Sequence, residues 1–226
     1  MRKTGGKSML NSDELYKMNS TEFAEYVKRK QQKKSSHGKA NGKFTVSDSD
    51  IIYIDKETGD IVPASDIKTA NNKKIIVLHR IIASRDIGKR VKKGERGGYV
   101  ESQKNVGWLG LSWVYDNSMI YGNAKIHGNA SVKDGSIVRG NTEVYGNSLI
   151  SKKSVISGSA KIMNKAIISN TKVSGKSEIF GETVICDSDI KDTCLYGNLH
   201  LNEVRLRGGE YYLNDNMLNN DYKISK

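Results

Sequence analysis

The stretch VYDNSMIYGNAKIHGNASVKDGSIVRGNTEVYGNSLI, residues 114–150, repeats a six-residue pattern. Each unit opens with a β-branched residue, passes through a pair rich in Gly and Asn, and carries a small residue at its fifth position. Continued to residue 168, the first positions are all Val or Ile: Val114, Ile120, Ile126, Val132, Val138, Val144, Ile150, Ile156, Ile162 and Ile168. β-Branched residues suit buried strands, whereas Gly and Asn tolerate the left-handed backbone of a sharp corner. A six-residue spacing does not mark one face of an α-helix, so a helix is excluded.

One short strand plus one corner in each unit predicts a parallel β-helix with three units, or 18 residues, in each coil. The pattern resembles the left-handed hexapeptide β-helix of sugar and acyl acetyltransferases, and this resemblance implies a left-handed coil with Ile120, Val138 and Ile156 stacked in one interior column. After Ile168 the steps become five or six residues. We predict less regular coils there, with these inward residues: Val173, Ile179, Ile185, Ile190, Leu195, Leu201 and Leu206.

The fold class is therefore mainly β, a parallel β-helix with a small α+β N-terminal capping module and a basic helical arm. We place the arm and its linker at residues 1–43, the strand-rich capping module at 44–112, and the β-helix at 113–209. Residues 210–226 form a C-terminal cap or a frayed tail. In the arm, residues 11–34 are predicted to be helical, from the N-cap residues and the basic C-terminal turn.

The capping module is predicted from short β-rich runs. Residues 51–54 and 61–62 flank a turn and are expected to form a hairpin. Residues 73–82 (KKIIVLHRII) are expected to form a buried strand. Glycines 94, 97 and 98 are expected to mark tight turns before residues 99–101. We expect this module to cover the open edge of the first coil.

The basic residues are unevenly distributed along the chain, whose net charge is +12. Residues 1–43 hold 11 Lys and Arg against 4 Asp and Glu, and residues 85–96 hold six basic and two acidic residues. Such clusters either are solvated or bind phosphate backbones and acidic surfaces. The candidate contacts to nucleic acid or a partner are Lys28, Arg29, Lys30, Lys33, Lys34, Arg85, Lys89, Arg90, Lys92, Lys93 and Arg96.

The residues that flank the inward positions form outward columns. Two of the three faces carry apolar columns, which either support the strands or form an interface with a second copy or a partner protein. The candidate interface residues are Trp113, Met119, Ile137, Leu149, Val155 and Ile167.

The sequence offers little for catalysis. His127 and His200 are weak candidates for the general base of a hexapeptide-type O-acyltransferase, but His127 lies in an ordinary repeat unit, IHGNA. The two cysteines, Cys186 and Cys194, are too few for a disulfide framework, and no metal site or cofactor is predicted. No apolar run approaches the length of a membrane helix and no secretory signal is present, so we expect a cytoplasmic protein that does not bind membranes.

The residues RGGYVES (96–102), WVYDN (113–117) and the repeats of Tyr-Gly-Asn-Ala or its variants resemble a bacteriophage and prophage family of hexapeptide-repeat β-helix proteins, often labelled transferase-like. The resemblance covers residues 74–170 and brings no catalytic residues. By analogy it implies an accessory protein in the host cytoplasm that inhibits a nuclease-type defence complex, as anti-CRISPR proteins do. Its expected partner is a host protein or nucleoprotein complex, with contacts to RNA or DNA backbone. The alternatives are the O-acyltransferase and a structural tail or fibre component.

Overall fold

The computed structural model describes residues 42–67 and 74–213, and these fall into two compact units. The smaller unit holds residues 52–67 and 74–77, and the larger holds residues 42–51 and 78–213. Residues 1–41 of the predicted arm and linker lie outside the described residues, as does the tail from residue 214. The candidate contact residues among them are Lys28, Arg29, Lys30, Lys33 and Lys34.

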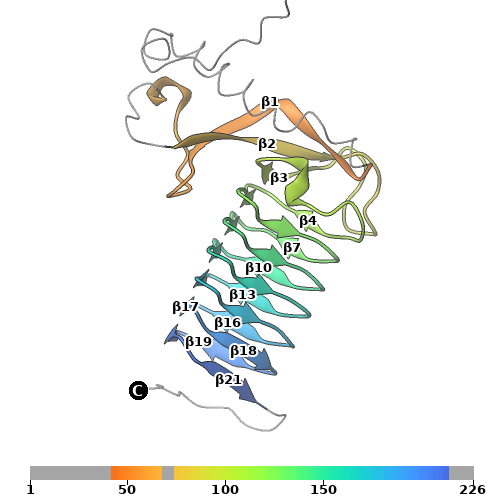
Figure 1. Ribbon diagram of the computed structural model, residues 1–226. Coiled ribbons are helices and arrows are strands. Elements are labelled where there is room, and N and C mark those ends of the chain that lie inside the picture. Colours follow the sequence, from red (N-terminus) through yellow and green to blue (C-terminus); the bar gives the residue numbers. More distant parts are fainter. Residues whose placement is uncertain (1–41, 68–73, 214–226) are drawn as a thin grey trace, which may run out of the picture. The chain divides into compact units, whose positions relative to one another are not determined.

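The regular secondary structure of the described residues is almost wholly β-strand (Figure 1). The two long strands are β1 (Phe44–Asp55) and β2 (Ile75–Ala83), and the first rung of the solenoid is β3 (Arg96–Val100). The strands of the first coils are β4 (Trp113–Val114), β5 (Met119–Ile120), β6 (Lys125–Ile126), β7 (Ser131–Val132), β8 (Ile137–Val138), β9 (Glu143–Val144), β10 (Leu149–Ser151), β11 (Val155–Ile156) and β12 (Lys161–Ile162). Those of the later coils are β13 (Ile167–Ser169), β14 (Lys172–Ser174), β15 (Glu178–Ile179), β16 (Val184–Cys186), β17 (Asp189–Lys191), β18 (Cys194–Gly197), β19 (His200–Asn202), β20 (Arg205–Arg207) and β21 (Glu210–Leu213). Two short 3₁₀-helices are η1 (Ala64–Asp66) and η2 (Gln103–Asn105).

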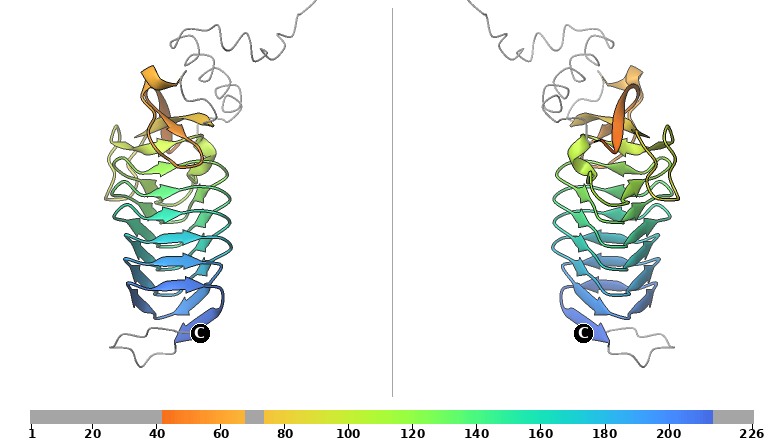
Figure 2. Two further views of the ribbon diagram at one scale, coloured as in Figure 1. Left: turned by 90° about the vertical axis from the view of Figure 1, so that its left-hand side faces the viewer. Right: turned by 90° about the vertical axis from the view of Figure 1, so that its right-hand side faces the viewer.

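The larger unit is a parallel β-solenoid whose coils stack on one another (Figure 2). Its three faces are three sheets, ordered β1-β2-β3-β5-β8-β11-β14-β17-β20, β19-β16-β13-β10-β7-β4 and β21-β18-β15-β12-β9-β6. Ile120 pairs with Val138, and Val138 with Ile156, as the six-residue spacing predicts. All ten Val and Ile residues of the repeat are completely buried. The prediction of a parallel β-helix is therefore confirmed.

The coils shorten along the axis. The step between paired residues is 18 from Val138 to Ile156, 17 from Ile156 to Val173, and 16 from Ile190 to Leu206. Four shortened corners hold an Asn, Asp or Glu in the left-handed conformation, for example Asn170 with a φ of 45°. The last one, between Leu206 and Tyr211, holds Gly208 and Gly209 with positive φ instead. The expected irregular coils are present, and six of their seven predicted inward residues are buried, whereas Leu201 is half-buried.

The smaller unit contains the expected hairpin. Ile54 and Ile61 form an antiparallel bridge, and the backbone N–H of Val62 donates to the carbonyl of Tyr53 at 2.8 Å. The Asp55 carboxylate accepts from the N–H of Glu57 and so supports the turn. The predicted buried strand near residues 73–82 is also present, as β2.

Two of the glycines predicted to lie in turns lie inside a strand instead. Gly97 and Gly98 belong to β3, which pairs in parallel with β5 and so forms the first rung of the solenoid. A Cβ atom at Gly98 would lie 2.5 Å from the carbonyl oxygen of Ser118, so close packing rather than a turn requires glycine there. Gly94, with a φ of 85°, does lie in a turn, as predicted.

Candidate partner-binding surface

The first coil carries an insertion that the regular repeat lacks. Val106 pairs with Ile126, and Val114 pairs with Val132. The inward residues Val106 and Val114 are thus eight positions apart rather than six, and the chain between them bulges as residues 107–112, GWLGLS, here called the insertion loop. In solenoid proteins, insertions of this kind often form the binding face.

The insertion loop exposes large apolar side chains. Trp108 is 65% exposed, Leu109 64% and Leu111 50%, which places them among the most exposed large apolar residues that the structure describes. These residues were not among the candidate interface residues predicted from sequence, because the regular units begin only at Val114. The signal was available: Val100 and Val106 continue the six-residue spacing backwards, so an extra pair of residues must lie between Val106 and Val114.

Both ends of the insertion loop are fixed by one buried lysine. The ammonium group of Lys43, in a fully buried residue, donates to the carbonyl oxygen of Gly107 at 3.1 Å and to Oγ of Ser112 at 3.0 Å. The N–H groups of Gly107 and Ser112 donate to carbonyl oxygens of the second coil at 2.7 and 2.8 Å. Gly110 makes the turn with a φ of 74°, and a Cβ atom there would lie 2.3 Å from the carbonyl oxygen of Gly128. The loop is therefore held in one conformation.

The environment of Lys43 leads to a prediction about pH. Burial, with a further contribution from the positive charge of Arg85, lowers the pKa of Lys43 from 10.5 to about 8. Between pH 8 and 10.5 the unfolded chain then binds more protons at this site, so the contribution of Lys43 to stability rises with pH. We expect the free energy of unfolding of the native chain, relative to that of Lys43→Met, to increase from pH 8 to pH 10 and to be flat below pH 8. Urea denaturation of both proteins across this range measures it, and a difference independent of pH would contradict the prediction.

The second part of the surface is the connection between β2 and β3, residues 84–95, here called the basic loop. Ile87 and Val91 form an antiparallel bridge and are 2% and 1% exposed, so they anchor the loop in the solenoid core. The residues around them point outwards and are exposed: Arg85, Lys89, Arg90, Lys92 and Lys93. The predicted cluster is thus a folded loop with an apolar anchor and a cationic exterior.

The two acidic residues of the basic loop form hydrogen bonds with other residues of the same loop. The Asp86 carboxylate accepts from the N–H of Lys93 at 2.8 Å and from Nζ of Lys92 at 3.0 Å, and these two hydrogen bonds lower its pKa. Glu95 accepts from the N–H of Lys92 at 2.9 Å. Among the described residues, no carboxylate forms an ion pair with Lys89, Arg90 or Lys93. The charges of these three side chains are therefore available to a partner.

Arg96, the last residue of the predicted cluster, has a structural role. Its guanidinium binds Asp50, which also accepts from Nε of Arg80 at 2.9 Å and from the hydroxyl of Tyr99 at 3.1 Å. Burial raises the pKa of Asp50, but the hydrogen bonds from Arg96, Arg80 and Tyr99 outweigh it and lower the pKa overall. Arg80 also donates to the carbonyl oxygens of Gly97 and Asp116, so this network ties β1 and β2 to the first coil. Arg96 is therefore paired with Asp50, as Lys92 is paired with Asp86, and neither charge is as free as those of Lys89, Arg90 and Lys93.

The two loops lie against each other. A Cβ atom at Gly88, in the basic loop, would lie 3.3 Å from Cδ2 of Leu111, in the insertion loop. Both loops belong to the larger unit and lie at the end of the solenoid where its first rung, β3, lies (Figure 1). The loop with the exposed apolar side chains therefore meets the loop with the unpaired cations at Leu111 and Gly88.

The predicted interface columns are only partly exposed. Trp113 is completely buried, because Phe44 of β1 packs edge-on against its indole at a centroid distance of 6.2 Å, so its predicted exposure is wrong. Met119 is also buried; its strand partner is Tyr99 of β3, so here too upstream strands cover the first coil. The other candidates are half-buried: Ile137, Leu149, Val155 and Ile167. Self-association through them stays a prediction.

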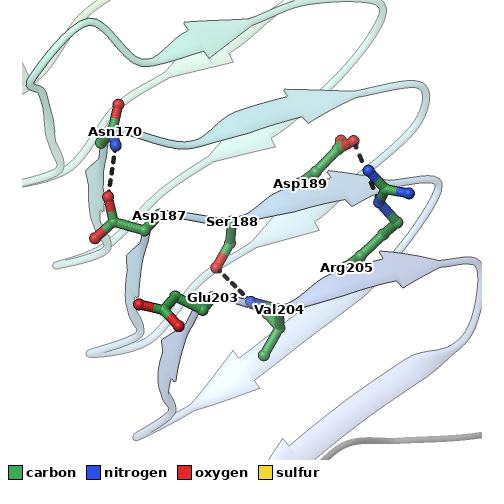
Figure 3. Close-up of a pocket in the computed structure, with 7 residues that line it drawn as sticks. All are labelled: Asn170, Asp187, Ser188, Asp189, Glu203, Val204 and Arg205. Atoms are coloured by element: carbon green, nitrogen blue, oxygen red, sulfur yellow. Dashed lines mark hydrogen bonds and ion pairs between the residues drawn. The ribbon is translucent and has the colours of Figure 1, made fainter.

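Both candidate histidines lie on outward faces of the solenoid. The His127 imidazole stacks on the Tyr145 ring at a centroid distance of 5.0 Å and an angle of 6°, within an outward column of the solenoid. His200 is exposed on β19, beside Val184. The open hollow in Figure 3 contains no histidine and is lined by Asn170, Asp187, Ser188, Asp189, Glu203, Val204 and Arg205.

The groups that line the hollow largely bind one another. Asn170 donates to the Asp187 carboxylate, Ser188 Oγ accepts from the N–H of Val204 at 3.1 Å, and Asp189 lies 4.0 Å from Arg205 (Figure 3). Within residues 42–67 and 74–213, no group of three or more His, Cys, Asp or Glu side chains is placed to hold a metal ion. The helices described in this chain are also too short to cross a membrane. Comparison with protein-family models finds no match for the chain, and comparison with curated proteins finds none either.

Proposed function

We propose that this chain is a non-enzymatic binding protein that uses a rigid solenoid to present the basic loop to a partner containing nucleic acid. The supporting observation is that Lys89, Arg90 and Lys93 are exposed and have no carboxylate partner in the described residues, while Ile87 and Val91 fix the loop that carries them. Exposed, unpaired cations on an anchored loop bind phosphates with an affinity that depends on salt and not on base sequence.

In its most specific form, the proposal is that the chain acts in the cytoplasm of a bacterial host as an accessory protein of a phage or prophage. There it inhibits a nuclease-type defence complex in the manner of an anti-CRISPR protein. This form rests on the resemblance of residues 74–170 to the phage β-helix family and on the +7 charge of residues 1–43. The basic arm and the basic loop then contribute separately to the same polyanion.

Charge reversal in the basic loop tests the proposal. We expect Lys89→Glu/Arg90→Glu to weaken binding to a fluorescein-labelled 15-base-pair DNA duplex about tenfold or more in 50 mM salt. We also expect it to reduce the slope of log K against log salt by about 2. Fluorescence anisotropy across a salt series measures both quantities.

The matched control is Lys172→Glu/Lys176→Glu, which changes the net charge equally on exposed lysines of later coils. We expect this control to bind the duplex within about twofold of the native chain. Equal weakening in the two variants would mean that only total charge matters, and the assignment to the basic loop would be wrong. Absence of binding by the native chain to duplex, single-stranded DNA and RNA alike in 50 mM salt would overturn the proposed function.

A further inference from the structure

We propose that Trp108 is a stacking platform for an unpaired base, so that the surface formed by the insertion loop and the basic loop binds single-stranded nucleic acid. This inference rests on the proposed function and names the form of nucleic acid that it takes. The chain holds one exposed and one buried tryptophan in the first coil, and only Trp108 presents its indole to solvent, at 65% exposure.

The backbone that carries Trp108 is held in place before any ligand binds. Lys43 ties Gly107 to Ser112 across the base of the insertion loop, and Gly110 makes a turn that admits no side chain. The N–H of Leu111 donates to Oδ1 of Asn129 at 3.3 Å, which adds a further link to the second coil. A preorganised loop loses little conformational entropy on binding, so an aromatic ring on it contributes more of its stacking energy to affinity.

The neighbouring charges select the ligand. Leu111 packs against Gly88, and the next two residues of the chain are the unpaired Lys89 and Arg90. Trp108 and these cations thus lie on two loops that meet at Leu111 and Gly88. An aromatic side chain and unpaired cations on one surface are the combination by which proteins hold single strands, since the ring stacks on a base while the cations bind nearby phosphates. Bases in a duplex are already stacked on one another, so a duplex engages the cations alone.

An acidic protein with an apolar groove would satisfy the same charges, but the composition of the basic loop favours nucleic acid. Three of its five exposed cations are lysines: Lys89, Lys92 and Lys93. Lysine is depleted from protein–protein interfaces, whereas phosphate backbones are bound by lysine and arginine alike.

The experiment compares single strands with duplex in native and Trp108 variants. Fluorescence anisotropy is measured with 15-nucleotide oligo-dT, 15-nucleotide oligo-U and the 15-base-pair DNA duplex. We expect Trp108→Ala to weaken binding to one or both single strands about tenfold and to change duplex binding less than twofold, while Trp108→Phe retains most of the affinity. The oligo-dT and oligo-U arms distinguish DNA from RNA. Ile61→Ala, which removes another exposed apolar side chain, is expected to leave all three affinities unchanged.

Intrinsic fluorescence gives a second readout. Because Trp113 is buried, a bound base is expected to quench Trp108 selectively, and the quenching is expected to be absent in Trp108→Phe. Unchanged single-strand binding by Trp108→Ala, or equal losses for single strand and duplex, would overturn the stacking role. If the charge-reversal variant Lys89→Glu/Arg90→Glu is still weakened in that case, the proposed function stands without it.

Discussion

Replacing Ile150 with alanine is expected to lower the free energy of unfolding by about 4 kcal/mol. Ile150 is completely buried, and its strand pairs with β7 on one side and β13 on the other, so its side chain stacks between Val132 and Ile168. Neighbouring coils continue on both sides, so the column cannot collapse into the space that the missing atoms leave. The cost therefore combines lost burial with a persistent cavity.

The control for this prediction is the adjacent outward residue. Leu149 lies on the same strand but is half-buried, and Leu149→Ala is expected to cost about 1 kcal/mol or less. Urea denaturation followed by circular dichroism measures both variants. Equal losses at the two positions would mean that the interior column does not carry the stability of the solenoid.

Gly98→Ala is expected to cost about 3 kcal/mol, although alanine is a small residue and Gly98 lies in a strand. Its Cβ atom would lie 2.5 Å from the carbonyl oxygen of Ser118 and 2.5 Å from Cγ1 of Val114. The Ser118 carbonyl already accepts from the N–H of Tyr99 at 2.8 Å, so it cannot move away without breaking the pairing of the first rung. Overpacking at this point would separate β3 from the solenoid.

Gly94→Ala separates this steric cost from the cost of backbone conformation. Gly94 has a φ of 85°, but nothing lies within 4 Å of its Cβ position. Alanine there is expected to cost about 1 kcal/mol, from the left-handed conformation alone. Thermal and urea unfolding of the two alanine variants test the difference. A loss at Gly98 no larger than that at Gly94 would contradict the close packing of β3.

The solenoid could be predicted from sequence because the residues that specify it lie close together in the chain and recur in every unit. A Val or Ile every six residues, with Gly or Asn at the corner, specifies the inward column, the corner and the pairing register together. The shortened coils were also predictable, since Val173 and Ile190 follow their predecessors at five residues and retain the inward apolar residue. The burial of Trp113 and Met119 could not be predicted in this way. It depends on residues that precede the regular repeat, since Phe44 packs on Trp113 and Tyr99 pairs with Met119.

The sequence by itself determined the stacked coils, the positions of their corners and the location of a positive cluster at residues 85–96. The repeat places the same residue types in every unit, and the charge of a segment can be counted without knowing which residues it contacts. Only the tertiary structure decided which cations remain unpaired and that Arg96 binds Asp50. It also decided that Lys43 binds Gly107 of the insertion loop, 64 residues away in the chain. Single long-range contacts of this kind leave no repeating trace in the sequence. For that reason, the surface formed by Trp108 and the basic loop emerges only when the first coil is folded.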